Sequence, residues 1–147
     1  MTSFGSCESK TTNKIIPLAE KGVSVHFHND EKKLVRKIQI DRCHFNPRGH
    51  GSTLCCDWLL IDSLNGHHFV ELKGHDVDHA VLQLGATIDR LGLKKSTIEK
   101  RAYVIMRSDS STRTDIAILK AKFLSDYKGL LRISRSGSKY LIPAGIR

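Results

Sequence analysis

The chain lacks the patterns that would place it in a membrane or in a secreted disulfide framework. No apolar run approaches the roughly 20 residues of a membrane-spanning helix, and the first residues lack the apolar region of a secretory signal. The four cysteines have no regular spacing, and the adjacent Cys55 and Cys56 would point to opposite faces of a strand. We therefore expect an intracellular, cytoplasmic protein in a reducing environment that does not bind membranes.

Histidine and cysteine also lack the spacings that zinc sites use. Neither Cys-x-x-Cys nor His-Glu-x-x-His occurs. Eight histidines are present, and His75 and His79 have helical spacing, so a zinc site assembled from distant residues is an open alternative. Internal repeats and low-complexity stretches are absent as well. The 147 residues suit a single domain with its own core.

Acidic residues are scarce in the C-terminal part of the chain. Residues 1–89 contain 10 Lys and Arg against 11 Asp and Glu, whereas residues 90–147 contain 14 against 4. A net charge of +9 that is concentrated in this way favours a nucleic-acid backbone as partner, although an ordinary solubilising surface would have the same composition. The candidate nucleic-acid contacts are Arg48, Lys94, Lys95, Arg107, Arg113, Arg132, Arg135 and Lys139.

The strongest local pattern lies in residues 55–91. The short apolar run 58–61 is typical of a buried strand. Residues 63–66 end in Asn-Gly, the pair favoured in hairpin turns. Residues 69–73 then predict a second strand, which Gly74 ends. We expect a β-hairpin followed by a helix.

Three ionisable side chains meet in this hairpin. Glu71 and Lys73 are two residues apart and therefore share a face of the second strand, and the hairpin brings Asp57 alongside Glu71. Two carboxylates are hard oxygen ligands suited to Mg²⁺, and a nearby lysine can stabilise negative charge on a reacting phosphate. An ordinary exposed charge pair between Glu71 and Lys73 is the alternative.

Asp57, a gap of 13 residues and then Glu71-Leu72-Lys73 resemble the PD-(D/E)XK nuclease superfamily. The resemblance covers residues 55–107, and Cys56 stands where the proline of the superfamily name would be. It implies a restriction-endonuclease-like α/β fold, a mixed central sheet flanked by helices on both sides.

The resemblance also implies roles for individual residues. Asp57 and Glu71 would be metal ligands together with the backbone carbonyl of Leu72, and Lys73 would be the catalytic lysine. Gln83, on the following helix and facing back, resembles the additional glutamine motif of some branches. The cofactor would be Mg²⁺, for which Mn²⁺ can substitute.

The remaining elements are predicted from hydrophobic period and turn residues. Residues 1–14 are expected to be flexible, and residues 108–147 to form a basic helix and hairpin. Glu20, on the first helix, is either a solvated carboxylate or a neighbour of the metal. The predicted elements are a helix at 13–20, a hairpin of strands 23–27 and 35–43, a loop at 46–52, a helix from 76 to 91, a strand at 102–106, a helix at 114–127 and a hairpin of strands 130–133 and 139–142.

These observations favour a Mg²⁺-dependent endonuclease that hydrolyses phosphodiester bonds in DNA. A homo-oligomer, most simply a homodimer, is expected because a small nuclease domain needs two sites to cut two strands. Two alternatives stay open. One is a catalytically silent nuclease-fold protein that binds nucleic acid or a protein partner, and the other is a structural subunit that docks through its basic surface.

Overall fold

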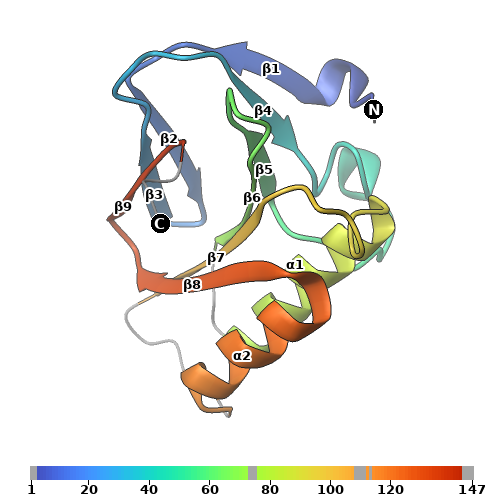
Figure 1. Ribbon diagram of the computed structural model, residues 1–147. Helices are drawn as coiled ribbons and strands as arrows, with labels where there is room; N and C mark the ends of the chain where they lie inside the picture. Colours follow the sequence, from blue (N-terminus) through green and yellow to red (C-terminus); the bar gives the residue numbers. More distant parts are fainter. Residues whose placement is uncertain (1–2, 73–75, 108–111, 113, 144–147) are drawn as a thin grey trace.

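The computed structural model describes residues 3–72, 76–107, 112 and 114–143 (Figure 1). The strands are β1 (Glu8–Thr11), β2 (Ile15–Glu20), β3 (Val23–His28), β4 (Val35–Gln39), β5 (Trp58–Ile61), β6 (His67–Leu72), β7 (Lys100–Met106), β8 (Gly129–Arg135) and β9 (Ser138–Leu141). The helices are α1 (Val77–Arg90) and α2 (Ile116–Tyr127), with two short 3-10 turns, η1 (Gly5–Cys7) and η2 (Pro47–Gly49).

The larger sheet has the strand order β1-β4-β5-β6-β7-β8. Neighbouring strands are antiparallel from β1 to β6, whereas β6, β7 and β8 are parallel. Parallel neighbours need a crossover connection, and α1 and α2 supply the two crossovers. This mixed sheet confirms the expected α/β class, and β7 covers the strand expected at 102–106.

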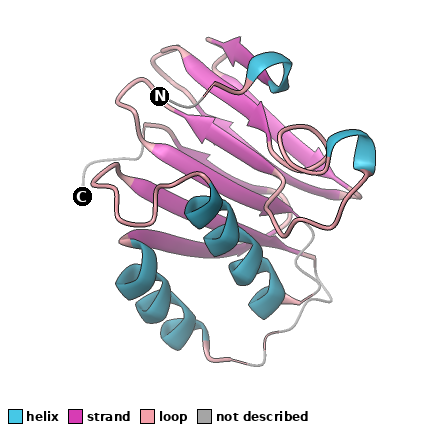
Figure 2. Ribbon diagram, turned by 90° about the vertical axis from the view of Figure 1, so that its right-hand side faces the viewer, coloured by secondary structure: helices cyan, strands magenta, loops and turns pink. Residues whose placement is uncertain are grey.

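Both helices lie on one face of the larger sheet, so the expectation of helices on both sides is wrong (Figure 1, Figure 2). The strands β6, β7 and β8 are neighbours in this order across the sheet. When successive right-handed crossovers move the same way across a sheet, their helices lie on the same face. Ala80, Leu84 and Ile88 of α1 belong to the first core, together with Phe69 and Val104 of the sheet.

A smaller sheet covers the opposite face of the larger one. Its strand order is β2-β3-β9, with β3 and β9 parallel. Val25 and Phe27 of β3 are buried in a second core with Val70, Leu72 and Tyr103 of the larger sheet. The protein therefore has three layers, with a separate core on each side of the larger sheet.

The N-terminal segment differs from the expectation. Residues 13–20 were expected to be a helix, but Ile15–Glu20 forms β2 because Ile16 and Leu18 are buried while their neighbours are exposed, which is the two-residue period of a strand. Glu8–Thr11 forms β1 and pairs with β4, where a flexible terminus was expected.

Neither of the two outer hairpins predicted from the sequence forms. β3 pairs with β2 and β9, while β4 pairs with β1 and β5. At the other end of the chain, Leu131 and Ile133 of β8 pack against the helices, whereas Tyr140 and Ile142 pack in the second core. These apolar residues need different cores, so the chain crosses from one sheet to the other between β8 and β9.

A hydrogen-bonded group of polar side chains is buried beside the second core. His68 Nε2 lies 2.7 Å from Asp62 Oδ2, and His68 Nδ1 lies 2.8 Å from the Tyr103 hydroxyl. Asp62 also accepts the N–H groups of Leu64 and Gly66 in the predicted Asn-Gly turn. One carboxylate therefore links the β5–β6 turn to β6 and β7.

Cys7 and Cys43 form a disulfide, with Cα atoms 5.7 Å apart, that ties η1 to the segment after β4. Structural disulfides persist in oxidising compartments, so this bond does not fit well with the reducing location expected from the cysteine pattern. Cys55 and Cys56 are buried thiols. In the part of the chain that the structure describes, no helix is long and apolar enough to cross a membrane.

Candidate functional site

The β5–β6 hairpin brings Asp57 next to Glu71, as the sequence predicted. Trp58, the first residue of β5, pairs with Val70, and Asp57 is hydrogen-bonded to Val70 and Leu72, the residues on either side of Glu71. The Asp57 N–H donates to the Val70 carbonyl at 3.1 Å, and the Asp57 carbonyl accepts the N–H of Ile40 at 2.9 Å. The main chain of Asp57 is thus held by β4 and β6, where β5 begins and β6 ends.

The Asp57 carboxylate also closes the end of the strand pair. Its Oδ2 accepts the backbone N–H of Leu72 at 2.8 Å, so a side chain supplies the acceptor for a main-chain donor at the end of β6. The Asp57 side chain is buried, and Glu71 is 0% exposed. Burial of a carboxylate is costly unless cations or hydrogen-bond donors compensate its charge.

Lys73, the third residue predicted to converge here, lies outside the described residues. The prediction that it meets Asp57 and Glu71 therefore stays a prediction. Leu72, whose carbonyl was a predicted ligand, is the last residue of β6, and its side chain is buried in the second core.

Two buried thiols, Cys55 and Cys56, lie near these carboxylates and have raised pKa values. Burial raises the pKa of Cys55 to about 12, and the charges of Asp41, Glu71 and Asp57 act in the same direction. Burial also raises the pKa of Cys56, with further contributions from Glu71 and Asp57. Both thiols are therefore protonated near neutral pH, which makes them poor nucleophiles.

A small polar cavity opens beside Asp57. We call it the polar cavity; its volume is about 120 Å³ and it is lined by Glu20, Lys21, Asp41, Arg42, Asp57 and Leu72. Arg42 Nη2 lies 2.9 Å from Glu20 Oε1. Asp41 Oδ1 accepts the backbone N–H of Arg42 and the Nδ2–H of Asn46, both at 3.0 Å. Three acidic and two basic side chains therefore line this cavity.

Only some of the residues that line the polar cavity were predicted from the sequence. Glu20 was considered as a neighbour of the metal, and it does lie beside Asp57, but at the end of a strand and paired with Arg42. The Arg42 guanidinium bonds to Glu20, whereas Asp41 accepts hydrogen bonds from the Arg42 main chain and from Asn46. Lys21 was missed, because the β2–β3 turn reaches the site only through packing of the smaller sheet.

Gln83 faces back toward the motif but does not line the polar cavity. Its Nε2 donates to the carbonyl of Cys55 at 3.1 Å. One turn later, Thr87 Oγ1 accepts the N–H of Cys56 at 2.8 Å, and Arg90 Nε donates to the carbonyl of Leu54 at 3.2 Å. This stripe of α1 fixes the segment that leads into Asp57, so Gln83 acts as a positioning residue in the structure.

The donors at the site fit a hard cation better than zinc. Within the described residues, no group of three or more His, Cys, Asp and Glu side chains is arranged to hold a metal ion. Asp57 and Glu71 supply carboxylate oxygens, which suit Mg²⁺ because this ion keeps several of its waters. The described histidines and cysteines do not form the zinc site that was the alternative.

Three of the predicted basic contacts lie at the edge of the sheet that holds Asp57 and Glu71. Met106 pairs with Arg135 in parallel β7 and β8, so Arg107 and Arg135 stand where these strands end, as β6 does at Leu72. Arg48 is part of η2, in the connection that joins β4 to β5 at this edge. Arg107 and Arg135 therefore lie at the strand ends of this edge, and Arg48 lies in a connection on the same side.

The other predicted contacts lie elsewhere. Lys94 and Lys95 follow α1 and precede β7, at the opposite edge, and Lys94 Nζ lies 5.6 Å from the Tyr127 ring centroid. Arg132 and Lys139 are exposed on β8 and β9, and Arg113 lies outside the described residues.

Part of the basic character of residues 90–147 is internal. Lys100 is buried and its Nζ donates to the carbonyls of Ser96 and Ile98. Arg101 is buried and pairs with Glu99 at 3.0 Å. These two cations are therefore not available to a nucleic acid.

Comparison of the chain with protein-family models, with curated proteins and with solved structures found no match.

Proposed function

We propose that the protein is a metal-dependent endonuclease that hydrolyses phosphodiester bonds in DNA. The observation that carries the proposal is the placement of Asp57 beside Glu71, where β5 begins and β6 ends. Leu72 and Lys73 follow Glu71 directly in the sequence. This edge also receives the ends of β7 and β8 with Arg107 and Arg135, whose charges suit a phosphate backbone.

In this proposal Asp57, Glu71 and the carbonyl of Leu72 hold Mg²⁺ or Mn²⁺. When bound, such an ion lowers the pKa of a coordinated water and holds a phosphate oxygen. Lys73 would place a cation on the reacting phosphate, and Gln83 keeps the approach to Asp57 in position through Cys55. The restriction-endonuclease-like assignment of the fold belongs to the same proposal, supported by the mixed sheet and by α1 directly after the motif.

A homo-oligomer and an intracellular location are further parts of the proposal. Two copies would provide the two sites needed for cleavage of both strands. The Cys7–Cys43 disulfide does not fit well with a reducing compartment.

The decisive experiment compares three variants with the wild type. Lys73→Ala should lower the cleavage rate of plasmid DNA in Mg²⁺ by about 10²–10³, the usual loss for one preorganised donor, while Mn²⁺ binding is retained. Asp57→Asn keeps an oxygen for the Leu72 N–H but removes the charge, so it should weaken both cleavage and Mn²⁺ binding. Asp89→Asn, an exposed carboxylate on α1, is the control and should cut at the wild-type rate.

Wild-type activity should disappear in EDTA and return with Mg²⁺. Wild-type cleavage by Lys73→Ala would refute the catalytic assignment. If the Asp57→Asn variant unfolds, Glu71→Gln tests the metal site in its place, because this change leaves the hydrogen bond between Asp57 and the Leu72 N–H untouched.

A second candidate is a catalytically silent nuclease-fold protein that binds nucleic acid. The Asp57 carboxylate already accepts the Leu72 N–H, which is a structural use of the residue that needs no metal. Such a protein would bind duplex DNA without EDTA-sensitive cleavage. Its affinity should fall with salt, with a slope of about −0.9 in log K against log salt for each phosphate neutralised. A flat salt dependence would remove nucleic acid as the partner.

A further inference from the structure

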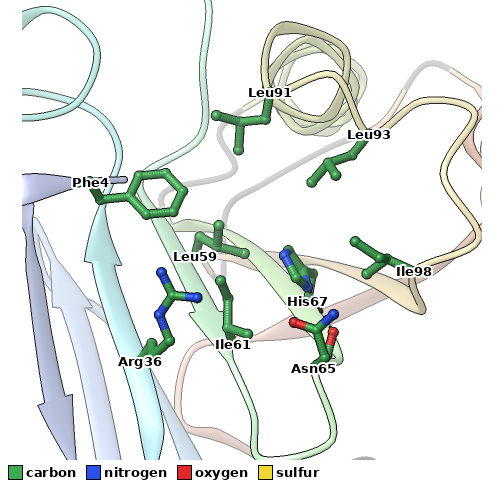
Figure 3. Close-up of a pocket in the computed structure, with 9 residues that line it drawn as sticks. All are labelled: Phe4, Arg36, Leu59, Ile61, Asn65, His67, Leu91, Leu93 and Ile98. Atoms are coloured by element: carbon green, nitrogen blue, oxygen red, sulfur yellow. Dashed lines mark hydrogen bonds between the residues drawn. The ribbon is translucent and has the colours of Figure 1, made fainter. Parts of the chain in front are cut away.

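A second cavity lies on the helix-covered face of the larger sheet, at the turn end of the β5–β6 hairpin and away from Asp57 and Glu71. Its volume is about 470 Å³, within the range of about 300–1,000 Å³ that small-molecule sites occupy. We call it the apolar cavity. Figure 3 shows Phe4 on one side, Leu91, Leu93 and Ile98 on the other, and Leu59, Ile61 and His67 between them.

The apolar walls come from distant parts of the chain. Leu59 and Ile61 of β5 are buried, as is Phe4, which precedes η1. Leu91, Leu93 and Ile98, in the connection from α1 to β7, are half-buried. The connection covers this part of the sheet only partly, because α1 ends at Arg90. Apolar side chains therefore surround a space that a small apolar molecule can fill.

His67 is the polar group at the centre of the apolar cavity, and it is 8% exposed. Its Nδ1 lies 2.9 Å from the backbone carbonyl of Asn65. A carbonyl oxygen can only accept, so Nδ1 carries the proton. Burial lowers the pKa of His67, which keeps the ring neutral at neutral pH. Its Nε2 is then an acceptor, and it bonds to none of the residues that the structure describes.

The charge at the rim of the cavity is compensated. The Arg36 guanidinium donates to both carboxylate oxygens of Glu8, at 2.9 and 2.8 Å. An anionic ligand would have to compete with Glu8 for this guanidinium. The combination of apolar walls, one hydrogen-bond acceptor and a neutralised cation selects against charged ligands.

We propose that the apolar cavity binds an uncharged, mainly apolar small molecule of one or two rings, which donates one O–H or N–H hydrogen bond to Nε2 of His67. The proposal does not rest on the nuclease function, because the cavity and the Asp57–Glu71 pair lie at opposite ends of the β5–β6 hairpin. Binding should need neither a metal ion nor DNA.

Indole and 1-methylindole test the proposal as a matched pair of probes. Their ring systems are the same, but only indole has an N–H to donate. In titrations of the ¹⁵N-labelled wild type followed by NMR, indole should shift the backbone amides of His67, Leu93 and Ile98. Its affinity should exceed that of 1-methylindole about two- to twelvefold, which corresponds to one hydrogen bond.

Two variants locate the site. His67→Phe keeps the ring but removes the acceptor, so indole should bind no better than 1-methylindole. Leu93→Trp fills the cavity from its half-buried rim and should abolish binding of both probes. Leu82→Trp, at a 61% exposed position in the groove between α1 and α2, is the control and should bind both probes as the wild type does.

Three results would overturn the proposal. They are the absence of amide shifts at millimolar indole, equal affinities of the two probes for the wild type, and unchanged binding by Leu93→Trp. If His67→Phe fails to fold, the comparison of the two probes on the wild type still decides whether a hydrogen bond is donated to the protein.

Discussion

The buried Asp62 carboxylate is hydrogen-bonded to the N–H groups of Leu64 and Gly66 and to the ring of His68. Burial raises the pKa of this carboxyl group, but the hydrogen bond and charge of His68 and the N–H groups of Gly66 and Leu64 outweigh burial and lower it overall. Gly66 is required here, because a Cβ at this position would lie 2.6 Å from Asp62 Oδ2. The ionised carboxylate is therefore part of the folded state.

This lowered pKa predicts how stability depends on pH. The folded-state pKa of Asp62 lies below the unfolded value, which is about 4, so its contribution is complete above that pH and is lost as the pH falls through the folded pKa. Urea unfolding of Asp62→Asn between pH 7 and 3 should show a lower free energy at pH 7 and a weaker loss on acidification. Ser63→Ala, an exposed change in the same turn, should follow the wild type; equal acid dependence in Asp62→Asn would contradict the assignment.

The contact between α1 and α2 depends on the absence of one side chain. A Cβ on Gly85 would lie 2.3 Å from the hydroxyl oxygen of Tyr127 and 2.5 Å from Cζ of its ring. The Tyr127 ring packs beside Phe123, with centroids 4.9 Å apart, and lies close to Lys94. Moving the ring away would therefore lose contacts on both sides.

The effect of Gly85→Ala on stability should be opposite in the wild type and in a Tyr127→Ala background. Alanine is about 1 kcal/mol better than glycine inside a helix, but overpacking against Tyr127 costs about 1–3 kcal/mol. We expect Gly85→Ala to destabilise the wild type and to stabilise a Tyr127→Ala variant by about 1 kcal/mol. Chemical denaturation of the four proteins measures this cycle, and a stabilising effect in both backgrounds would show that the ring moves freely.

Elements were predictable from the sequence where their contacts are local. The β5–β6 hairpin, its Asn-Gly turn and α1 follow from neighbouring residues, and the hairpin brings Asp57 beside Glu71. The pairing of β3 with β9 was not predictable, because a strand edge does not specify a distant partner. For the same reason Lys21 was missed at the polar cavity, and both outer hairpins were predicted wrongly.

At the scale of the whole molecule, the Cys7–Cys43 bond closes a loop with a sequence separation of 36. The chain-entropy model gives about 4 kcal/mol for a loop of this length. The wild type should therefore lose several kcal/mol of unfolding free energy in dithiothreitol, measured by urea denaturation. A Cys7→Ser/Cys43→Ser variant should be as weak as the reduced wild type and indifferent to the reductant. A wild type that dithiothreitol leaves unchanged would refute the bond as a stabilising element.

The pairing of β3 with β9 also sets the order in which the protein can mature during synthesis. The Ser24 N–H bonds to Ser136 Oγ, 112 positions later in the chain. A ribosome that adds about 5–20 residues per second needs on the order of ten seconds to cover that distance. Throughout this time the edge of β3 that pairs with β9 is unpaired, and the ring of Phe27 lacks Tyr140, which stacks on it in the folded protein. A nascent chain of this protein therefore offers chaperones an apolar strand until almost all of the residues described here have emerged.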